Sequence, residues 1–181
     1  MRAKILIPTL SAMALALLAC ALPVLSGCGP FWVDPYITVT PSQLNWVEIH
    51  YYNLNRKPVR RVSVRLQGVG VVELKKGTSD LVSNDFARKY RSETWDGIVT
   101  RKIPVDPDHL NEIFQDLVNY GLLDREKWGR KSKKTEFKRF IAVKANICTH
   151  TYSEQENIFE VDPDLAEKLL DVVREFDNPT F

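Results

Sequence analysis

The sequence predicts an α+β domain, built on a single, largely antiparallel sheet with two helices packed on one of its faces. Three observations lead to this fold class. Short segments that alternate apolar and polar residues are typical of half-buried strands. Two longer segments have the apolar spacing of amphipathic helices. The order along the chain is strands, helix, strands, helix, which is typical of helices layered on an antiparallel sheet.

The predicted strands are rich in aromatic and β-branched residues and are bounded by turn signals. They cover residues 44–54, 62–67, 71–76, 95–105 and 137–154. The second and third form the clearest hairpin, because Val62, Val64 and Leu66 alternate with polar residues and a glycine-containing turn follows. The last segment is long enough for two strands, and we expect it to turn near Ala145-Asn146. This alternation leaves the other face of the sheet polar, or available to a partner.

Two helices are predicted at 105–121 and 161–176, and both begin with the residues Val-Asp-Pro-Asp. Asp106 can accept hydrogen bonds from the first turn, and Gly121 fits the position just after the last turn. The predicted inward residues are Leu110, Ile113, Phe114, Leu117 and Val118, and then Leu165, Leu169, Val172, Val173 and Phe176. The repeated start reflects either a duplicated strand–helix unit or a favourable helix start that arose twice. We prefer the second explanation, because the preceding strands do not match.

The first thirty residues have the three parts of an export signal. Arg2 and Lys4 supply the positive start, and residues 5–25 are apolar apart from two hydroxyl residues and two prolines. The small residues Ser26 and Gly27 come last. A positive start stays on the cytoplasmic side while the apolar run enters the membrane, so the pattern predicts an exported protein.

The residues Leu25-Ser26-Gly27-Cys28 resemble the lipobox of bacterial lipoproteins, which is a branched aliphatic residue, two small residues and a cysteine. The resemblance implies cleavage before Cys28 and attachment of diacylglycerol to its thiol, with a further acyl chain on its amine in many bacteria. Two or three chains hold a protein stably at a membrane, whereas one chain holds it only marginally. Enterobacterial lipoproteins of the inner membrane have aspartate where this chain has Gly29, so the resemblance favours the outer membrane in a Gram-negative cell.

Two alternatives to cleavage at Cys28 are open. The apolar run is long enough to span a bilayer uncleaved, although its prolines and positive start disfavour this. The residues Leu17-Leu18-Ala19-Cys20 also resemble a lipobox, but leucine is bulky for the second position. Beyond the lipobox, the chain is similar only in style to small uncharacterised bacterial lipoproteins.

Cleavage before Cys28 divides the chain into a signal peptide at 1–27, a short membrane tether at 28–36 and a single α+β domain at 37–181. The only charged residues of the signal peptide are two cations, so the mature chain has 23 basic and 23 acidic side chains. A neutral, exported chain gives no reason to expect a nucleic-acid partner. The sequence has no Gly-rich phosphate loop and no HExxH, CxxC or GxSxG motif, so we predict no cofactor.

Apart from Cys28, the mature chain has one cysteine, and a disulfide framework is therefore excluded. The stretch Cys148-Thr149-His150 would place a thiol and an imidazole on the same side of a strand, as in a cysteine–histidine pair or half of a metal site. Zinc needs three or four ligands, and only His50 and His109 remain as further histidines. We prefer a small core cysteine and a surface histidine, and predict no metal.

Two pairs of aspartates also need an interpretation, namely Asp106 with Asp108 and Asp162 with Asp164. General acid–base catalysis uses two carboxylates that face one substrate atom and have different pKa values. Each pair here stands at a helix start, where side-chain oxygens cap the helix and its dipole favours anions. Capping is therefore the interpretation that we prefer.

A basic segment with interleaved aromatic residues spans 128–139 and is the predicted interaction surface. Its residues are Trp128, Arg130, Lys131, Lys133, Lys134, Lys138 and Arg139. An envelope protein, a glycan or an anionic lipid would suit it, since each cation near an anionic membrane contributes about 1 kcal/mol. The alternative is a solvated loop that the acidic C-terminal part of the chain neutralises.

Three hypotheses about function remain. The first is a lipid-anchored, non-catalytic binding or interaction module of the bacterial cell envelope. The second is an envelope enzyme with an unrecognised site near Cys148 and His150. The third is a structural component of the envelope. We rank the binding module first, because the anchor, the short tether and the basic segment require no catalytic residues, and we name none.

Overall fold

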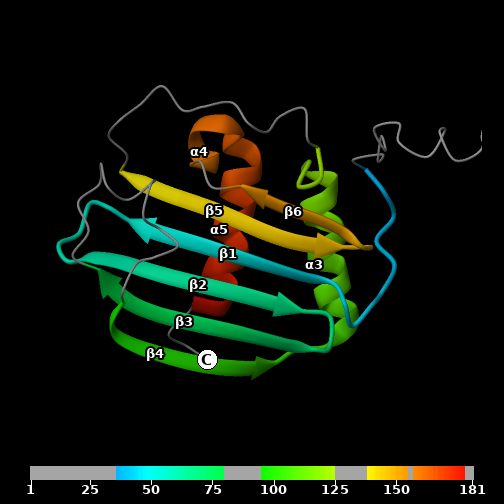
Figure 1. The fold of residues 1–181 in the computed structure, drawn as a ribbon, viewed down its shortest axis with the longest axis horizontal. Coiled ribbons are helices and arrows are strands. Elements are labelled where there is room, and N and C mark those ends of the chain that lie inside the picture. The colour runs from blue at the N-terminus through cyan, green and yellow to red at the C-terminus, as the bar shows by residue number, and fades with distance from the viewer. Residues whose placement is uncertain (1–35, 80–94, 125–137, 155–156, 178–181) are drawn as a thin grey trace, which may run out of the picture. The chain divides into compact units, whose positions relative to one another are not determined.

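The computed structural model describes residues 36–79, 95–124, 138–154 and 157–177. All of them belong to one compact unit, Asp34–Phe181. The predicted fold class is confirmed, because a single six-stranded antiparallel sheet carries two long helices on one face (Figure 1). In the described part of the chain no helix has the length and apolar character needed to span a membrane.

The strands lie in the order β4-β3-β2-β1-β5-β6 across the sheet. Their bounds are β1 Trp46–Asn53, β2 Val59–Gln67, β3 Val71–Ser79, β4 Asp96–Pro104, β5 Arg139–Ile147 and β6 His150–Glu154. The first four strands form a meander that runs outward to β4. The chain then passes through helix α3, Pro107–Asn119, and returns to place β5 on the other side of β1.

The strand register places the apolar residues of neighbouring strands on the same face. Val47 lies opposite Leu66, and Ile49 lies opposite Val64 on β2 and Val143 on β5. Because side chains alternate between faces along a strand, a slip by one residue would turn all of these side chains away from the helices. The alternating pattern of the sequence therefore fixes the pairing of the central strands.

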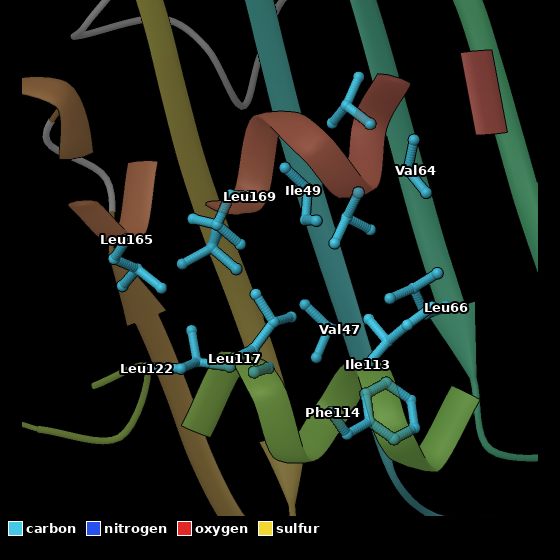
Figure 2. Packing of buried hydrophobic residues seen from close by; sticks show 14 of the residues in the cluster. Val47, Ile49, Val64, Leu66, Ile113, Phe114, Leu117, Leu122, Leu165 and Leu169 are labelled. Carbon is cyan, nitrogen blue, oxygen red and sulfur yellow. The ribbon is translucent and has the colours of Figure 1, made fainter. Parts of the chain in front are cut away.

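The main core lies between the sheet and the two long helices, and Figure 2 shows its side chains pointing toward one another. Leu117 of α3 and Leu169 of α5 are fully buried there, as are Val47 and Ile49 of β1. A fully buried side chain of this size contributes about 1.5–3 kcal/mol relative to an exposed one. This layer is therefore the principal source of the fold's stability.

Helix α3 begins and ends where its sequence signals predict. A side-chain oxygen of Asp106 accepts a hydrogen bond from the backbone N–H of Asp108 at 3.0 Å, which caps the first turn. Gly121 has a φ of 90°, the left-handed conformation in which glycine commonly ends a helix. All five predicted inward residues of this helix are buried.

The second predicted helix is divided into two. A single turn, α4 Ile158–Val161, precedes α5 Pro163–Asp177. Asp162 stands between them, and one of its oxygens accepts a hydrogen bond from the backbone N–H of Leu165 at 3.2 Å. The expected aspartate cap is thus present, but α5 starts two residues later than predicted because Val161 still belongs to α4.

The predicted turn near Ala145-Asn146 is wrong. Both residues belong to β5, where Ala145 is fully buried and the Asn146 side-chain amide donates to the Leu44 carbonyl at 2.9 Å. The chain turns instead at Cys148 and Thr149, with φ values of 48° and 68°. Positive φ at both central residues is the pattern of a type I′ hairpin turn, which normally selects Asn and Gly.

Candidate functional site

The structure does not support a cysteine–histidine pair at Cys148. This residue lies in the hairpin turn and not on a strand, so the expectation that it shares a strand side with His150 is wrong. Its N–H donates to a side-chain oxygen of Asn45 at 3.0 Å, and its Sγ accepts a weak hydrogen bond from the Thr40 N–H at 3.4 Å. These contacts from residues before β1 hold the turn, which gives the cysteine a structural explanation.

The three histidines lie on different elements and are not brought together. His50 is buried on β1, on the face that points away from the long helices, whereas His150 lies opposite the core residue Ile147 and so shares the helix-bearing face. His109 is half exposed on α3, with Nε2 2.8 Å from an oxygen of Glu175 on α5. The hydrogen bond to Glu175 raises the pKa of His109 above its usual value.

Asp106 and Asp162 each cap a helix, because they accept from the backbone N–H groups of Asp108 and Leu165. Asp108 and Asp164 are acidic residues of the two first turns. A hollow of about 500 Å³ beside α5 is acidic, with Asp162, Asp164, Glu167 and Asp171 on its walls. Within the described ranges, however, no group of three or more His, Cys, Asp or Glu side chains is placed to hold a metal ion.

Most of the predicted basic interaction surface lies outside the described residues, as does Cys28. Lys138 is described and exposed. Arg139 is described but is used within the domain, because its guanidinium pairs with Glu167 at 2.9 Å and lies 4.3 Å from the ring centre of Phe159. These contacts join β5 to α4 and α5, while 42% of the Arg139 side chain stays exposed, so its place in an interaction surface stays a prediction.

A charge ladder crosses the helix-free face, meaning the face of the sheet that points away from α3 and α5. Five directly opposite residues alternate in sign across five strands. They are Lys144 on β5, Glu48 on β1, Arg65 on β2, Glu73 on β3 and Lys102 on β4. Opposite charges that face each other across strands stabilise a sheet by about 0.2–1 kcal/mol a pair.

Glu48 is the most strongly held member of the charge ladder. His50 Nε2 lies 2.9 Å from one of its oxygens, and an Arg65 nitrogen lies 4.0 Å from the other. The hydrogen bond from His50 lowers the pKa of Glu48 to about 2, against the opposing effect of burial. This carboxylate is therefore charged at neutral pH and accepts hydrogen bonds instead of donating a proton.

The sequence predicted that the helix-free face is polar or available to a partner, but part of this face is covered by apolar side chains. Tyr52, Val59, Phe140 and Ala142 form a second apolar cluster there, with Tyr52 and Phe140 fully buried in an edge-to-face contact. The buried guanidinium of Arg61 is stacked beside this cluster. A second, smaller core therefore lies on this face, where β1 ends and where β2 and β5 begin.

Arg61 is held between two aromatic rings. Its guanidinium carbon lies 5.0 Å from the ring centre of Tyr52 and 3.8 Å from that of Trp95. Gly77 lies directly opposite Arg61 on β3, and a Cβ there would come within 3.1 Å of the Trp95 ring and 2.9 Å of the Asp96 carbonyl. The glycine therefore makes the space in which the tryptophan covers the cation at the start of β4.

The most accessible element of the sheet is its edge strand β4. Every residue of β4 is exposed except Ile103, which is half buried, and the large apolar side chains of Ile98 and Val99 are 53% and 57% exposed. Arg101 and Lys102 add two adjacent cations. Long, flat edge strands with apolar side chains are sites at which another strand can pair.

A hollow of about 520 Å³ lies next to β4 on the helix-bearing face and is called here the basic hollow. It is lined by Arg60, Leu74, Lys76, Gly77, Thr78, Gly97, Val99 and Arg101. Arg60 and Lys76 both pair with Asp177 at the end of α5. The basic hollow therefore combines cations, two of which are paired within the domain, with the apolar side chains of Leu74 and Val99.

The sequence predicted a strand at 95–105 but not its exposure. Ile98 and Val99 put apolar side chains on opposite faces, Arg101 and Lys102 put cations on opposite faces, and of the β4 residues only Ile103 packs against the main core. A strand without one apolar face is a signal of an uncovered edge, and this signal was available in the sequence.

Comparisons with known proteins identify no relative. No protein-family model, no curated protein and no solved structure matches this chain.

Proposed function

We propose that this protein is a lipid-anchored, non-catalytic binding module of the bacterial cell envelope. The anchoring part rests on the lipobox-like residues that end at Cys28 and on the short tether after them. The binding part rests on one structural observation, the exposed edge strand β4 with the basic hollow beside it. Such a surface suits a partner that lies along the molecule, since it is long and shallow.

The anchor is tested by the intact mass of the N-terminal peptide from protein extracted in detergent. We expect a chain that begins at Cys28 with a diacylglyceryl or triacyl mass, and loss of that mass in Cys28→Ser. An unmodified Cys28, or a chain that still begins at Met1, would contradict the anchor.

The binding surface is tested by a photo-crosslinking side chain placed in intact cells. Lys102 on β4 is the probe position, and Asp171 on the outer side of α5 is the matched control, because both are exposed. We expect a discrete envelope partner to be crosslinked from position 102 and not from position 171. Equal crosslinking from both positions, or none from either, would contradict a binding surface at β4.

A further inference from the structure

We infer that β4 binds an extended peptide segment as a seventh strand of the sheet, and that the segment carries two adjacent acidic residues followed by apolar ones. This inference rests on the proposed binding function and deepens it, because it names the class of partner and the way it pairs. It is carried by the backbone of β4, by the charges at its C-terminal end and by the apolar side chains at its N-terminal end.

The backbone hydrogen bonds show which groups of β4 face outward. The Val105 N–H donates to the Gly70 carbonyl at 3.0 Å, directly beyond the pair of Val71 with Pro104. In an antiparallel pair, directly opposite residues alternate between exchanging hydrogen bonds and facing away from each other. The alternation is preserved along the regular register from Pro104 to Val99.

Counting along this register assigns Ile103, Arg101 and Val99 to the hydrogen-bonded pairs with β3. Thr100 and Lys102 fall between them, so their N–H and C=O groups point away from the sheet. Pro104 falls on an outward position as well, which explains why its missing N–H costs no bond to β3. The outer edge of β4 therefore offers a run of donors and acceptors to another strand.

The side chains of β4 select the partner's chemistry. Arg101 points to the helix-bearing face, where it lines the basic hollow, and Lys102 points to the helix-free face, where it ends the charge ladder. An added strand therefore meets one cation on each face at adjacent positions. Opposite charges directly across a strand pair stabilise it and like charges destabilise it, so two adjacent acidic residues fit best.

The apolar half of β4 fixes the direction of the motif. Val99 and Ile98 precede the two cations, also on opposite faces, and both are more than half exposed. In an antiparallel arrangement the partner reads acidic, acidic, polar, apolar, apolar from its N-terminus. A second copy of this chain is a poorer partner, because its β4 strand has no pair of adjacent acidic residues.

The test uses full-length protein in detergent and a fluorescent peptide, Ser-Thr-Glu-Glu-Thr-Val-Val-Ser-Lys, blocked at both ends. We expect saturable binding by fluorescence anisotropy. Replacing the two glutamates by lysine should weaken binding about tenfold, and the variant that combines Arg101→Glu with Lys102→Glu should reverse this preference. Absence of binding, or a variant that does not change the preference, would overturn the inference.

A second measurement separates strand addition from simple charge attraction. N-methylation of the third and fifth peptide residues removes the amides that would face Lys102 and Thr100, and we expect binding to be lost. N-methylation of the fourth and sixth residues, whose amides would face away, is the matched control and should preserve binding. Equal loss from both methylated peptides would contradict a seventh strand in this register.

The outcomes also separate this inference from the proposed function. Crosslinking from position 102 without binding of either peptide would keep the binding function and overturn the seventh strand. A doubled mass of the protein in detergent that Thr100→Pro restores to the monomer value, with no peptide binding, would identify a second copy as the occupant and likewise overturn it.

Discussion

The two sides of the sheet are finished differently, because β5 receives hydrogen bonds from a buried side chain of the domain whereas β4 is exposed. On the β5 side, β6 pairs with Val143–Ile147, so residues 139–142 pair with β1 but have no described strand on their outer side. The buried side chain of Asn157 takes that place, since it accepts from the Ile141 N–H at 3.1 Å and donates to the Arg139 carbonyl at 3.0 Å. On the β4 side, the outward backbone groups of Thr100 and Lys102 lie in an exposed strand. Arg101, Lys102 and Pro104 are residues of the kinds that discourage unspecific pairing at such an edge, so β4 is exposed but not unprotected.

The largest expected effect comes from removing the substitute partner of β5. Asn157→Ala leaves one buried N–H and one buried carbonyl without hydrogen bonds, and should lower the free energy of unfolding by about 2–4 kcal/mol. Urea unfolding measures this. Asn157→Asp retains the acceptor for the Ile141 N–H but buries a carboxylate whose second oxygen faces the Arg139 carbonyl, so it should cost at least as much. A loss below about 0.5 kcal/mol in both variants would mean that Asn157 does not protect this edge.

The charge ladder connects the protected side to the open one, and acid should weaken its centre most. Because the pKa of Glu48 is lowered to about 2, its stabilising effect is present above the unfolded value of about 4.5 and is lost as pH falls toward 2. Glu48→Gln should remove about 1–2 kcal/mol of this acid dependence, after allowance for solvent screening.

The matched variant for Glu48 is Glu73→Gln, beside the open edge. Lys75, 2.7 Å away, holds the pKa of Glu73 below its usual value as well, so the direction is the same. We expect a smaller change, because this pair is more accessible to solvent. Urea unfolding at pH 7, 5, 4 and 3 compares the two variants. An equal or larger effect of Glu73→Gln would show that burial does not determine which carboxylate contributes more to the acid dependence.

The end of α5 is attached to the β4 half of the sheet through Asp177, which pairs with Arg60 and Lys76. Asp177→Asn should lower the free energy of unfolding by about 1 kcal/mol, since both cations are partly exposed. Asp171→Asn is the control, because its pair with Arg174 is exposed on the same helix and should matter little. If Asp171→Asn lowers the free energy of unfolding as much as Asp177→Asn does, the ion pairs that join α5 to the sheet contribute no more than an exposed pair.

The smallest expected effect is at the open edge itself. The Thr100 N–H points outward, so Thr100→Pro should change the free energy of unfolding by less than about 0.5 kcal/mol. The matched control is Arg101→Pro, which removes an N–H that bonds to β3 and should cost about 3 kcal/mol or more. Thermal or urea unfolding that ranks these two variants in the reverse order would contradict the assigned backbone directions.

Most of the fold could be predicted from signals that lie within single helices and strands. The Asp106 cap, the apolar stripe of α3 and the alternation of β2 each act within one element, and the structure confirms them. The β5–β6 turn was misplaced because Cys148 and Thr149 carry no turn signal of their own and depend on Asn45 and Thr40, about a hundred residues away. The single-turn helix α4 was not predicted, because a segment of four residues is too short to show the apolar spacing of a helix.

The candidate site was less predictable than the fold. Arg139 belongs to a basic segment by sequence, yet Glu167 and Phe159 engage it because the fold brings α4 and α5 to β5. β4 is exposed because it is the last, outermost strand of the meander, and α3 and α5 cover the central strands of the sheet instead (Figure 1). The sequence of β4 alone does not show this position in the sheet. Lipidation of Cys28 remains a prediction from the sequence.

The position of β1 between β2 and β5 sets an order for synthesis. A chain emerging from the ribosome contains the whole β1–β4 meander once residue 104 is made, but β1 stays an open edge until residue 147 completes β5. Over this interval β1 is an edge of the nascent sheet, whereas in the complete sheet it lies between β2 and β5. A chain truncated before β5 therefore exposes the edge of β1 to any neighbouring strand.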